Sequence, residues 1–152
     1  MYVLNKIVRL FLWLLFFIYG LVLIKYLVLD RLFYMQFAGR MYNLYPFRTI
    51  STYFIDREHY NLDILIKNLL GNVVMLAPLG FLMPVMFKIY RRTFHFFTFI
   101  FILNLSIEIL QIALKLGSFD VDDLILNCTG AMMAYGLTRL LLTAFIKKER
   151  EV

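Results

Sequence analysis

The chain contains four apolar segments, and each is about as long as a bilayer is thick. They cover residues 10–29, 64–87, 94–116 and 123–146. A transmembrane helix needs about 20 consecutive, mostly apolar residues, and a helix satisfies its own backbone hydrogen bonds in lipid. We therefore predict an all-α integral membrane protein, a bundle of about four transmembrane helices.

Composition supports the same class and limits the number of domains. Hydrophobic residues make up 62% of the chain, against roughly 45–50% in soluble domains. With 152 residues, the sequence predicts a single membrane domain over 1–152. The one cysteine, Cys128, excludes an intramolecular disulfide. The first apolar run lacks a small-residue cleavage site, so we expect an uncleaved anchor and not a signal peptide.

The net charge of +6 comes from basic residues that flank the apolar runs. Three clusters of them contain Lys6, Arg9, Lys88, Arg91, Arg92, Lys147, Lys148 and Arg150. The positive-inside rule then predicts a multi-pass protein of the cell membrane with both termini and the 88–93 turn in the cytoplasm. The first loop and the acidic turn 117–122 would face outward. No basic stripe interleaved with aromatic residues exists, so the charge indicates membrane lipids as partners and no nucleic acid.

The loop between the first two apolar runs is rich in aromatic residues. It contains Phe33, Tyr34, Phe37, Tyr42, Tyr45, Phe47, Tyr53, Phe54 and Tyr60. A solvated linker would be polar and flexible, whereas aromatic rings favour the headgroup layer. We predict an interfacial or re-entrant loop, in which Pro46 breaks any helix.

Polar side chains with helical spacing occur in the third and fourth apolar segments. Asn104, Glu108, Gln111 and Lys115 are separated by four, three and four residues, and so share one helix face. Asp120, Asp123 and Asn127 repeat the three-then-four spacing in the next segment. A charged group at the centre of a membrane costs roughly 2.5–3.5 kcal/mol even on lenient insertion scales. Such stripes therefore indicate a site.

We predict that these stripes and two further polar groups form one pocket near the outer membrane boundary. The third and fourth segments meet at the turn 117–122, so their polar faces lie at the same depth. Convergence would let the buried polar groups satisfy one another. The predicted ligand-binding residues are Asn43, Arg48, Asn68, Asn72, Glu108, Gln111, Asp120, Asp123 and Asn127.

Five blocks of the sequence carry recognisable motifs. They are Asn43-Leu-Tyr-Pro46-Phe47, Asn68-Leu-Leu-Gly71-Asn72 with Pro78 and Pro84, Ser106-Ile-Glu108-x-x-Gln111, Phe119-Asp120-x-x-Asp123 and Asn127-x-x-Gly130. In these blocks the chain resembles the VanZ-like family. Ser118 stands where some members carry arginine, and Arg48 or Lys115 could replace that cation. The family's namesake is associated with low-level teicoplanin resistance in Gram-positive bacteria. The resemblance thus implies a role in the cell envelope and in glycopeptide susceptibility, without naming a reaction.

Structural roles compete with functional ones at many of these positions. Asn68 and Asn72 can stabilise helix packing, and Asp120 and Asp123 can cap the fourth helix. Glu108 favours a functional site, with Lys115 or an arginine as its neutralising partner. Other residues are expected to have a purely structural role or to face solvent. Pro78 and Pro84 would kink or end the second helix, Gly71, Gly80 and Gly130 would permit close helix approach, and Asp122 would be a solvated surface charge.

Three classes of function remain open. First, the polar site binds a lipid-linked or peptide-bearing envelope component, or a glycopeptide, without chemistry. Second, the catalytic candidates Glu108, Asp120 and Asp123 supply acid–base groups or bind a divalent cation in an enzyme acting on a lipid substrate. Third, an oligomer transports a lipid or an ion. We predict no cofactor and no metal site at His59 or His95, because neither has a ligand-spaced partner. The oligomeric state stays open.

Overall fold

The computed structural model describes residues 5–30, 32, 42–55 and 62–150. Side chains are described for all of these except residues 62–64 and 145–150. The predicted loop aromatics Phe33, Tyr34, Phe37 and Tyr60 therefore lie outside the described residues, as does His59. The side chains of the C-terminal basic cluster, Lys147, Lys148 and Arg150, are also outside the description.

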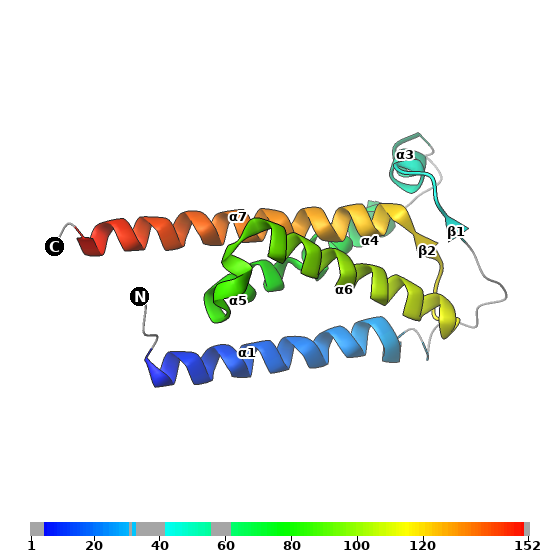
Figure 1. Ribbon diagram of the computed structural model, residues 1–152. Coiled ribbons are helices and arrows are strands. Elements are labelled where there is room, and N and C mark those ends of the chain that lie inside the picture. Colours follow the sequence, from blue (N-terminus) through cyan, green and yellow to red (C-terminus); the bar gives the residue numbers. More distant parts are fainter. Residues whose placement is uncertain (1–4, 31, 33–41, 56–61, 151–152) are drawn as a thin grey trace.

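Helices dominate the described chain (Figure 1). In chain order the elements are α1 (Lys6–Ile24), η1 (Lys25–Leu29), β1 (Tyr42–Asn43), α3 (Arg48–Ile55), α4 (Leu62–Met75), α5 (Ala77–Met86), η2 (Lys88–Arg91), α6 (Thr93–Ala113), β2 (Phe119–Asp120) and α7 (Val121–Arg150). Within the described part, four helical stretches are long and apolar enough to cross a membrane: Lys6–Leu29, Leu65–Met86, Thr93–Ala113 and Val121–Ala144. The predicted all-α bundle of four membrane helices is confirmed.

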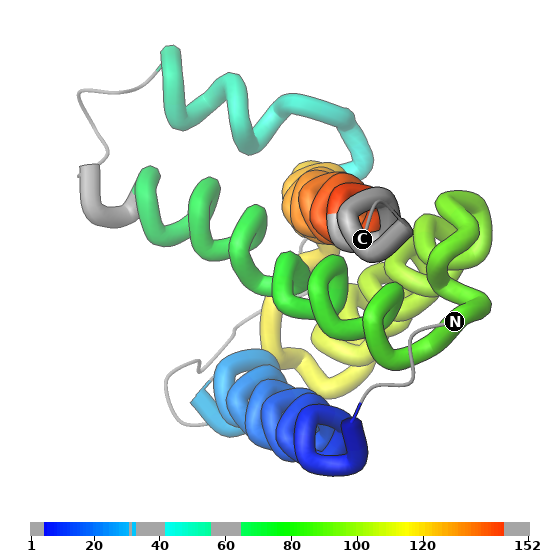
Figure 2. The backbone as a smooth tube through the Cα atoms, turned by 90° about the vertical axis from the view of Figure 1, so that its left-hand side faces the viewer, coloured from blue at the N-terminus to red at the C-terminus, as the bar shows by residue number. Residues whose placement is uncertain are grey.

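Both termini lie at one end of the bundle, and β1, β2 and α3 lie at the other (Figure 1). We call the second end the distal end. An even number of spans returns the chain to its starting side, so the turn η2 lies toward the termini. In the view along the bundle, α1 lies apart on one side, and α4–α5 crosses between it and α7 (Figure 2).

The second span is broken, whereas the sequence pattern predicted one segment over 64–87. Helix α4 ends at Met75, and α5 begins at Ala77 with Pro78 in its first turn. Leu76 between them has φ −98° and ψ 0°. Proline has no N–H to donate, so the helix cannot continue its hydrogen-bond ladder there. The expected kink at Pro78 is thus confirmed, while Pro84 lies inside α5.

Helix α7 approaches α4 and α5 so closely that glycine is required at two positions. A Cβ atom on Gly130 would lie 1.7 Å from the Val73 carbonyl oxygen. One on Gly80 would lie 2.4 Å from the Ala131 carbonyl oxygen. Such contacts are far below van der Waals distance, so close helix approach at Gly80 and Gly130 is confirmed. Gly71 differs, because its Cβ would meet only the Tyr26 hydroxyl, at 4.0 Å.

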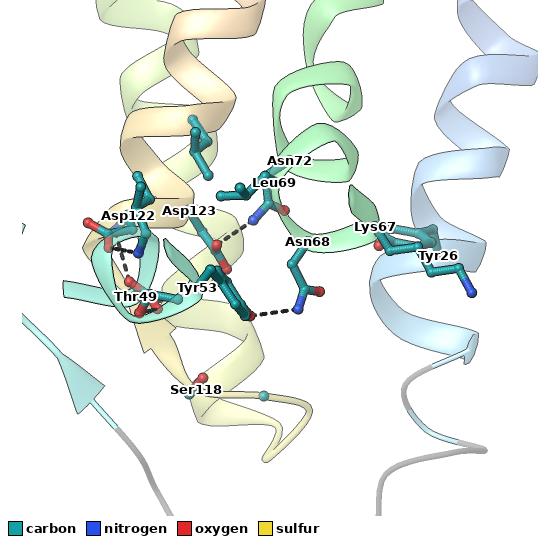
Figure 3. A pocket seen from close by; sticks show the side chains of 14 residues that line it. Tyr26, Thr49, Tyr53, Lys67, Asn68, Leu69, Asn72, Ser118, Asp122 and Asp123 are labelled. Atoms are coloured by element: carbon teal, nitrogen blue, oxygen red, sulfur yellow. Dashed lines mark hydrogen bonds between the residues drawn. The ribbon is translucent and has the colours of Figure 1, made fainter. Parts of the chain in front are cut away.

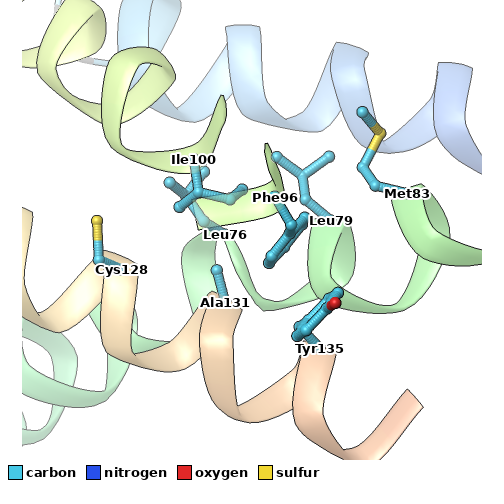
Figure 4. Close-up of a cluster of buried hydrophobic side chains, with 8 residues drawn as sticks. All are labelled: Leu76, Leu79, Met83, Phe96, Ile100, Cys128, Ala131 and Tyr135. Carbon is cyan, nitrogen blue, oxygen red and sulfur yellow. The ribbon is translucent and has the colours of Figure 1, made fainter. Parts of the chain in front are cut away.

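The apolar core lies at this helix crossing, between α5, α6 and α7 (Figure 4). Phe96 stacks on Tyr135 with ring centroids 4.6 Å apart. The buried cluster consists of Leu76, Leu79, Met83, Phe96, Ile100, Cys128, Ala131 and Tyr135. It joins α5, α6 and α7 into one packed unit.

Helix α1 docks on this unit through aromatic residues. The Tyr19 hydroxyl donates to the Met75 carbonyl oxygen at 2.7 Å, at the break between α4 and α5. The Leu79 N–H bonds to Leu76 there, so Tyr19 satisfies a carbonyl that the broken helix leaves without its usual partner. Trp13 contacts Phe87 edge-on at 5.8 Å. No α1 residue among Lys6–Ile24 is buried in the isolated chain.

The third helix ends earlier than the predicted boundary at residue 116. Lys115 has φ 58°, and the Leu116 N–H donates to the Gln111 carbonyl oxygen at 2.7 Å. The Lys115 N–H donates to Ile112 at 3.1 Å, which completes a Schellman C-cap with lysine in the position that glycine usually occupies. Helix α6 therefore stops at Ala113, and the prediction that Lys115 continues the polar helix face is wrong.

A short parallel strand pair ties the first loop to the turn before α7. Tyr42 pairs with Phe119, and Asn43 pairs with Asp120. This pairing brings the segment before α3 to the start of α7, 77 residues further along the chain. It positions the site described next.

Candidate functional site

A polar pocket of about 320 Å³ opens at the distal end (Figure 3). It lies between α3, α4 and α7, with Tyr26 of η1 and the turn after α6 completing its wall. The lining residues are Tyr26, Thr49, Ile50, Tyr53, Lys67, Asn68, Leu69, Asn72, Gly117, Ser118, Asp120, Asp122, Asp123 and Leu126. Four of the predicted site residues, Asn68, Asn72, Asp120 and Asp123, thus line one pocket.

Asp120 joins three elements through its carboxylate. Its Oδ1 accepts from the Asn43 amide at 2.9 Å and from the Asp122 N–H at 2.8 Å. Its Oδ2 accepts from the Thr49 hydroxyl at 2.6 Å. The bond to Asp122 caps α7, as the capping alternative predicted, because the side-chain oxygen satisfies an N–H in the first turn. The other two bonds fix β1 and α3 against the bundle.

Asp122 is buried, and the prediction of a solvated surface charge is wrong. Its side chain has 0% exposure. Its Oδ1 accepts from the Phe47 N–H at 2.5 Å and its Oδ2 from the Ile50 N–H at 3.0 Å. These amides belong to the start of α3, so the carboxylate caps that helix from another part of the chain. The spacing showed that Asp122 points away from the polar face shared by Asp120 and Asp123. On that side Asp122 meets α3 and not water.

Two amides of α4 reach the pocket from the opposite wall (Figure 3). Asn72 donates to the Asp123 carboxylate. Asn68 donates to the Tyr53 hydroxyl at 2.6 Å. The α4 wall is thereby linked to α7 through Asn72 and to α3 through Asn68. Asn68 and Asn72 therefore link helices, as the packing alternative predicted, and they also line the pocket.

Glu108 and Gln111 lie beneath the pocket and do not line it. They are 3% and 4% exposed. Oε2 of Glu108 accepts from the Asp120 N–H at 3.4 Å, so this glutamate supports the strand residue that anchors the site. Lys115, an expected partner of Glu108, has an exposed side chain beyond the end of α6.

Asn127 lies deeper, in a separate buried amide pair. Its Nδ2 donates to Asn104 Oδ1 at 3.2 Å, and Asn104 donates to the Leu124 carbonyl oxygen at 3.1 Å. Among described atoms, Asn127 Oδ1 is buried without a hydrogen-bond partner. This pair joins α6 to α7 and does not reach the pocket wall.

Arg48 does not line the main pocket. Its guanidinium lies 5.8 Å from the Tyr45 ring centroid, a cation–π contact. It lines a smaller hollow of about 210 Å³ with Asn43, Thr49, Thr52 and Tyr53. Of the nine predicted residues, the structure brings Asn68, Asn72, Asp120 and Asp123 together in the main pocket, whereas Asn43, Arg48, Glu108, Gln111 and Asn127 do not line it.

Thr49, Tyr53, Lys67 and Ser118 line the pocket but were not among the predicted site residues. Thr49 and Tyr53 lie on the same side of α3, four residues apart, and this spacing was a usable signal. It was hidden because the short helix α3 could not be recognised inside an aromatic loop. Among the described residues, no group of three or more His, Cys, Asp and Glu side chains is arranged to hold a metal ion.

The fold and pocket define a multi-pass α-helical membrane protein with a polar pocket at the end away from its termini. Residues 10–142 match the VanZ/LLP1 family. The chain is also 31% identical over 126 residues to Protein VanZ of Enterococcus faecium, covering 78% of this chain and 70% of that protein. The chain therefore belongs to the VanZ-like family. No solved structure matches it.

Proposed function

We propose that this protein modulates susceptibility to a glycopeptide antibiotic, most of all teicoplanin, by binding an envelope component in the distal pocket. The role in glycopeptide susceptibility is inferred from family membership and from the similarity to Protein VanZ. The observation that carries the proposal is the pocket lined by Asn68, Asn72 and Asp123 at the end of the bundle. Amides and carboxylates in a pocket of this size suit a small hydrogen-bonding headgroup or peptide.

The proposal also places the distal pocket outside the cell. Lys88 and Arg91 lie in the turn η2, at the same end as the basic N-terminal segment. The positive-inside rule assigns that end to the cytoplasm. The pocket would then open at the outer surface of the membrane, where a lipophilic glycopeptide meets its target.

Transport ranks behind binding because a packed apolar layer interrupts the buried polar groups partway through the bundle. Below the pocket come Glu108 and then the Asn104–Asn127 pair. The next layer toward the termini is the packed apolar cluster with Phe96, Ile100 and Ala131, each 0% exposed. A dry layer of this kind supports a closed pocket better than a pathway.

Of the three catalytic candidates, the structure weakens Asp120 and leaves Asp123 and Glu108 open. Asp120 accepts three hydrogen bonds from protein groups, which favours an anchoring role over acid–base chemistry. Asp123 lines the pocket and Glu108 supports Asp120 from below. A divalent cation would have to bind at Asp123 with pocket amide oxygens.

Expression in a teicoplanin-sensitive Gram-positive host tests the proposal. We expect the parent chain to raise tolerance to teicoplanin more than tolerance to vancomycin. Glu108→Gln and Asp123→Asn should abolish the gain, because both remove charge while conserving size. Asp30→Asn is the matched control, since Asp30 pairs with Lys25 outside the pocket lining.

Membrane abundance must be equal for all variants before their tolerances are compared. Full tolerance in both site variants would reject the pocket as the site. A parent chain without any effect on tolerance would reject the role, and would place the envelope-lipid enzyme first.

A further inference from the structure

Tyr26 forms the wall of the distal pocket on the side of α1. Its hydroxyl reaches across to Gly71 of α4, 4.0 Å from the position a Cβ atom would take there. Tyr26 belongs to η1, a π-helical turn that interrupts the regular end of α1. Such turns occur often at functional sites. A larger residue than glycine or alanine at position 71 would displace the Tyr26 ring.

Both helices beside this wall carry exposed apolar residues. Val22 of α1, and Leu70 and Val74 of α4, are 56%, 56% and 61% exposed in the isolated chain. In a membrane-spanning helix, apolar residues that face away from the protein contact acyl chains. The pocket is therefore separated from the acyl-chain region by Tyr26, so a molecule with one end in the pocket can keep its other end in the bilayer.

The charges of the pocket are arranged in order from this wall inward. Lys67 lies beside Tyr26 on the α1 side, and Asn72 and Asp123 lie further in (Figure 3). Asp122 lies at the far wall, against α3. Since Asp122 is occupied by the α3 amides, the Asp123 carboxylate is the inner acidic group, and a cation at the lipid side followed by this carboxylate matches a headgroup whose phosphate precedes an ammonium group.

We propose that the pocket binds an aminophospholipid, a lipid with a primary ammonium beyond its phosphate. The acyl chains leave past Tyr26 between α1 and α4, the phosphate contacts Lys67, and the ammonium lies near Asp123 and Asn72. This inference rests on the proposed function in one respect, that the distal pocket is the ligand site. It adds the class of ligand and its route of entry.

Fluorescence quenching in vesicles tests the lipid preference. Trp13 is the one tryptophan of the chain, so Trp13→Phe combined with Tyr26→Trp gives a sensor at the wall. The protein is reconstituted in phosphatidylglycerol vesicles that contain brominated-chain phosphatidylethanolamine or, in a parallel sample, brominated-chain phosphatidylglycerol. We expect several-fold stronger quenching by the phosphatidylethanolamine at equal mole fraction.

Matched variants in the sensor background separate the pocket from the surface. Asp123→Asn and Gly71→Leu should each make the two lipids quench equally, while Asp30→Asn should keep the preference. Gly20→Leu is the control for the added bulk, because no atom lies within 4 Å of a Cβ at that position. A preference that survives both pocket variants would place the lipid at the general surface and overturn the proposal.

A second measurement uses the chain with its own Tyr26 and Trp13. The protein is purified in detergent from vesicles with equal amounts of both lipids, and the retained lipids are counted by mass spectrometry. Phosphatidylethanolamine should be retained in excess by the parent and not by Asp123→Asn. No antibiotic is present in either assay, so equal retention would reject the lipid class and leave the tolerance result to decide the proposed function.

Discussion

The Asp120 carboxylate accepts a hydrogen bond from the Asn43 amide at 2.9 Å, although the two residues are 77 positions apart in the chain. The bond ties the segment between α1 and α4 to the start of α7. The same carboxylate holds Thr49 and the first turn of α7. This acidic side chain thus helps to hold α3, which forms one wall of the distal pocket. The position of that wall depends on Asp120 and on its neighbour Asp122.

Replacement of Asp122 by asparagine should loosen α3. The carboxylate accepts from two backbone amides of the segment Phe47–Ile50, and an asparagine offers one acceptor oxygen instead of two. We expect a loss of about 1–3 kcal/mol in the free energy of unfolding, measured by chemical denaturation in detergent. A cysteine at Ser51 should also become more reactive to thiol reagents. Asp30→Asn removes an exposed carboxylate and serves as the control; equal stability of the two variants would contradict the capping role.

Alanine at Gly130 should disrupt the packing of α7 against α4. The added methyl group would lie 1.7 Å from the Val73 carbonyl oxygen, so the helices must separate. We expect a loss of about 1–3 kcal/mol or more, seen as a lower thermal transition in detergent. Gly80→Ala should behave similarly. Gly136→Ala lies on the same helix as Gly130 with no atom within 4 Å, and it should be neutral or slightly stabilising. A neutral Gly130→Ala would show that α7 does not approach α4 this closely.

Loss of the Tyr19 hydroxyl should weaken the attachment of α1. Tyr19→Phe removes the bond to the Met75 carbonyl oxygen and keeps the ring. Hydrogen bonds between membrane helices contribute about 0.6 kcal/mol on average and about 1.7 at most, so the expected loss lies in this range. The bond exists because the helix breaks before Pro78, so Pro78→Ala should reduce the effect of Tyr19→Phe. A double-mutant cycle measures this coupling, and strictly additive losses would separate Tyr19 from the helix break.

The sequence predicted the bundle well because length and hydrophobicity alone determine which segments can cross a bilayer. It predicted Gly80 and Gly130 as close contacts for the same kind of reason, since small residues recur where membrane helices meet. Two results depended on information that periodicity lacks. Lys115 does not continue the polar helix face, because it adopts the left-handed conformation that ends α6. Glycine usually occupies such a position, so a lysine there gives no sequence signal for the helix end. Asp122 became buried because a distant segment, the start of α3, covers it. Part of the pocket could be predicted from helical stripes on α4 and α7, whereas the α3 wall required the tertiary fold.

The orientation of the bundle can be tested by cysteine labelling in intact cells. We expect Ser118→Cys, at the distal end, to react with a membrane-impermeant thiol reagent, because the positive-inside rule assigns that end to the outer surface. Arg91→Cys, in the turn η2 near the termini, should react only after the cells are permeabilised. Both variants carry Cys128→Ser, which removes the one native thiol of the chain. Because one span, α6, links the two positions, they must lie on opposite sides if the bundle crosses the membrane as proposed. The opposite labelling pattern would turn the distal pocket to the cytoplasm, and the proposed action at the outer surface would have to be abandoned.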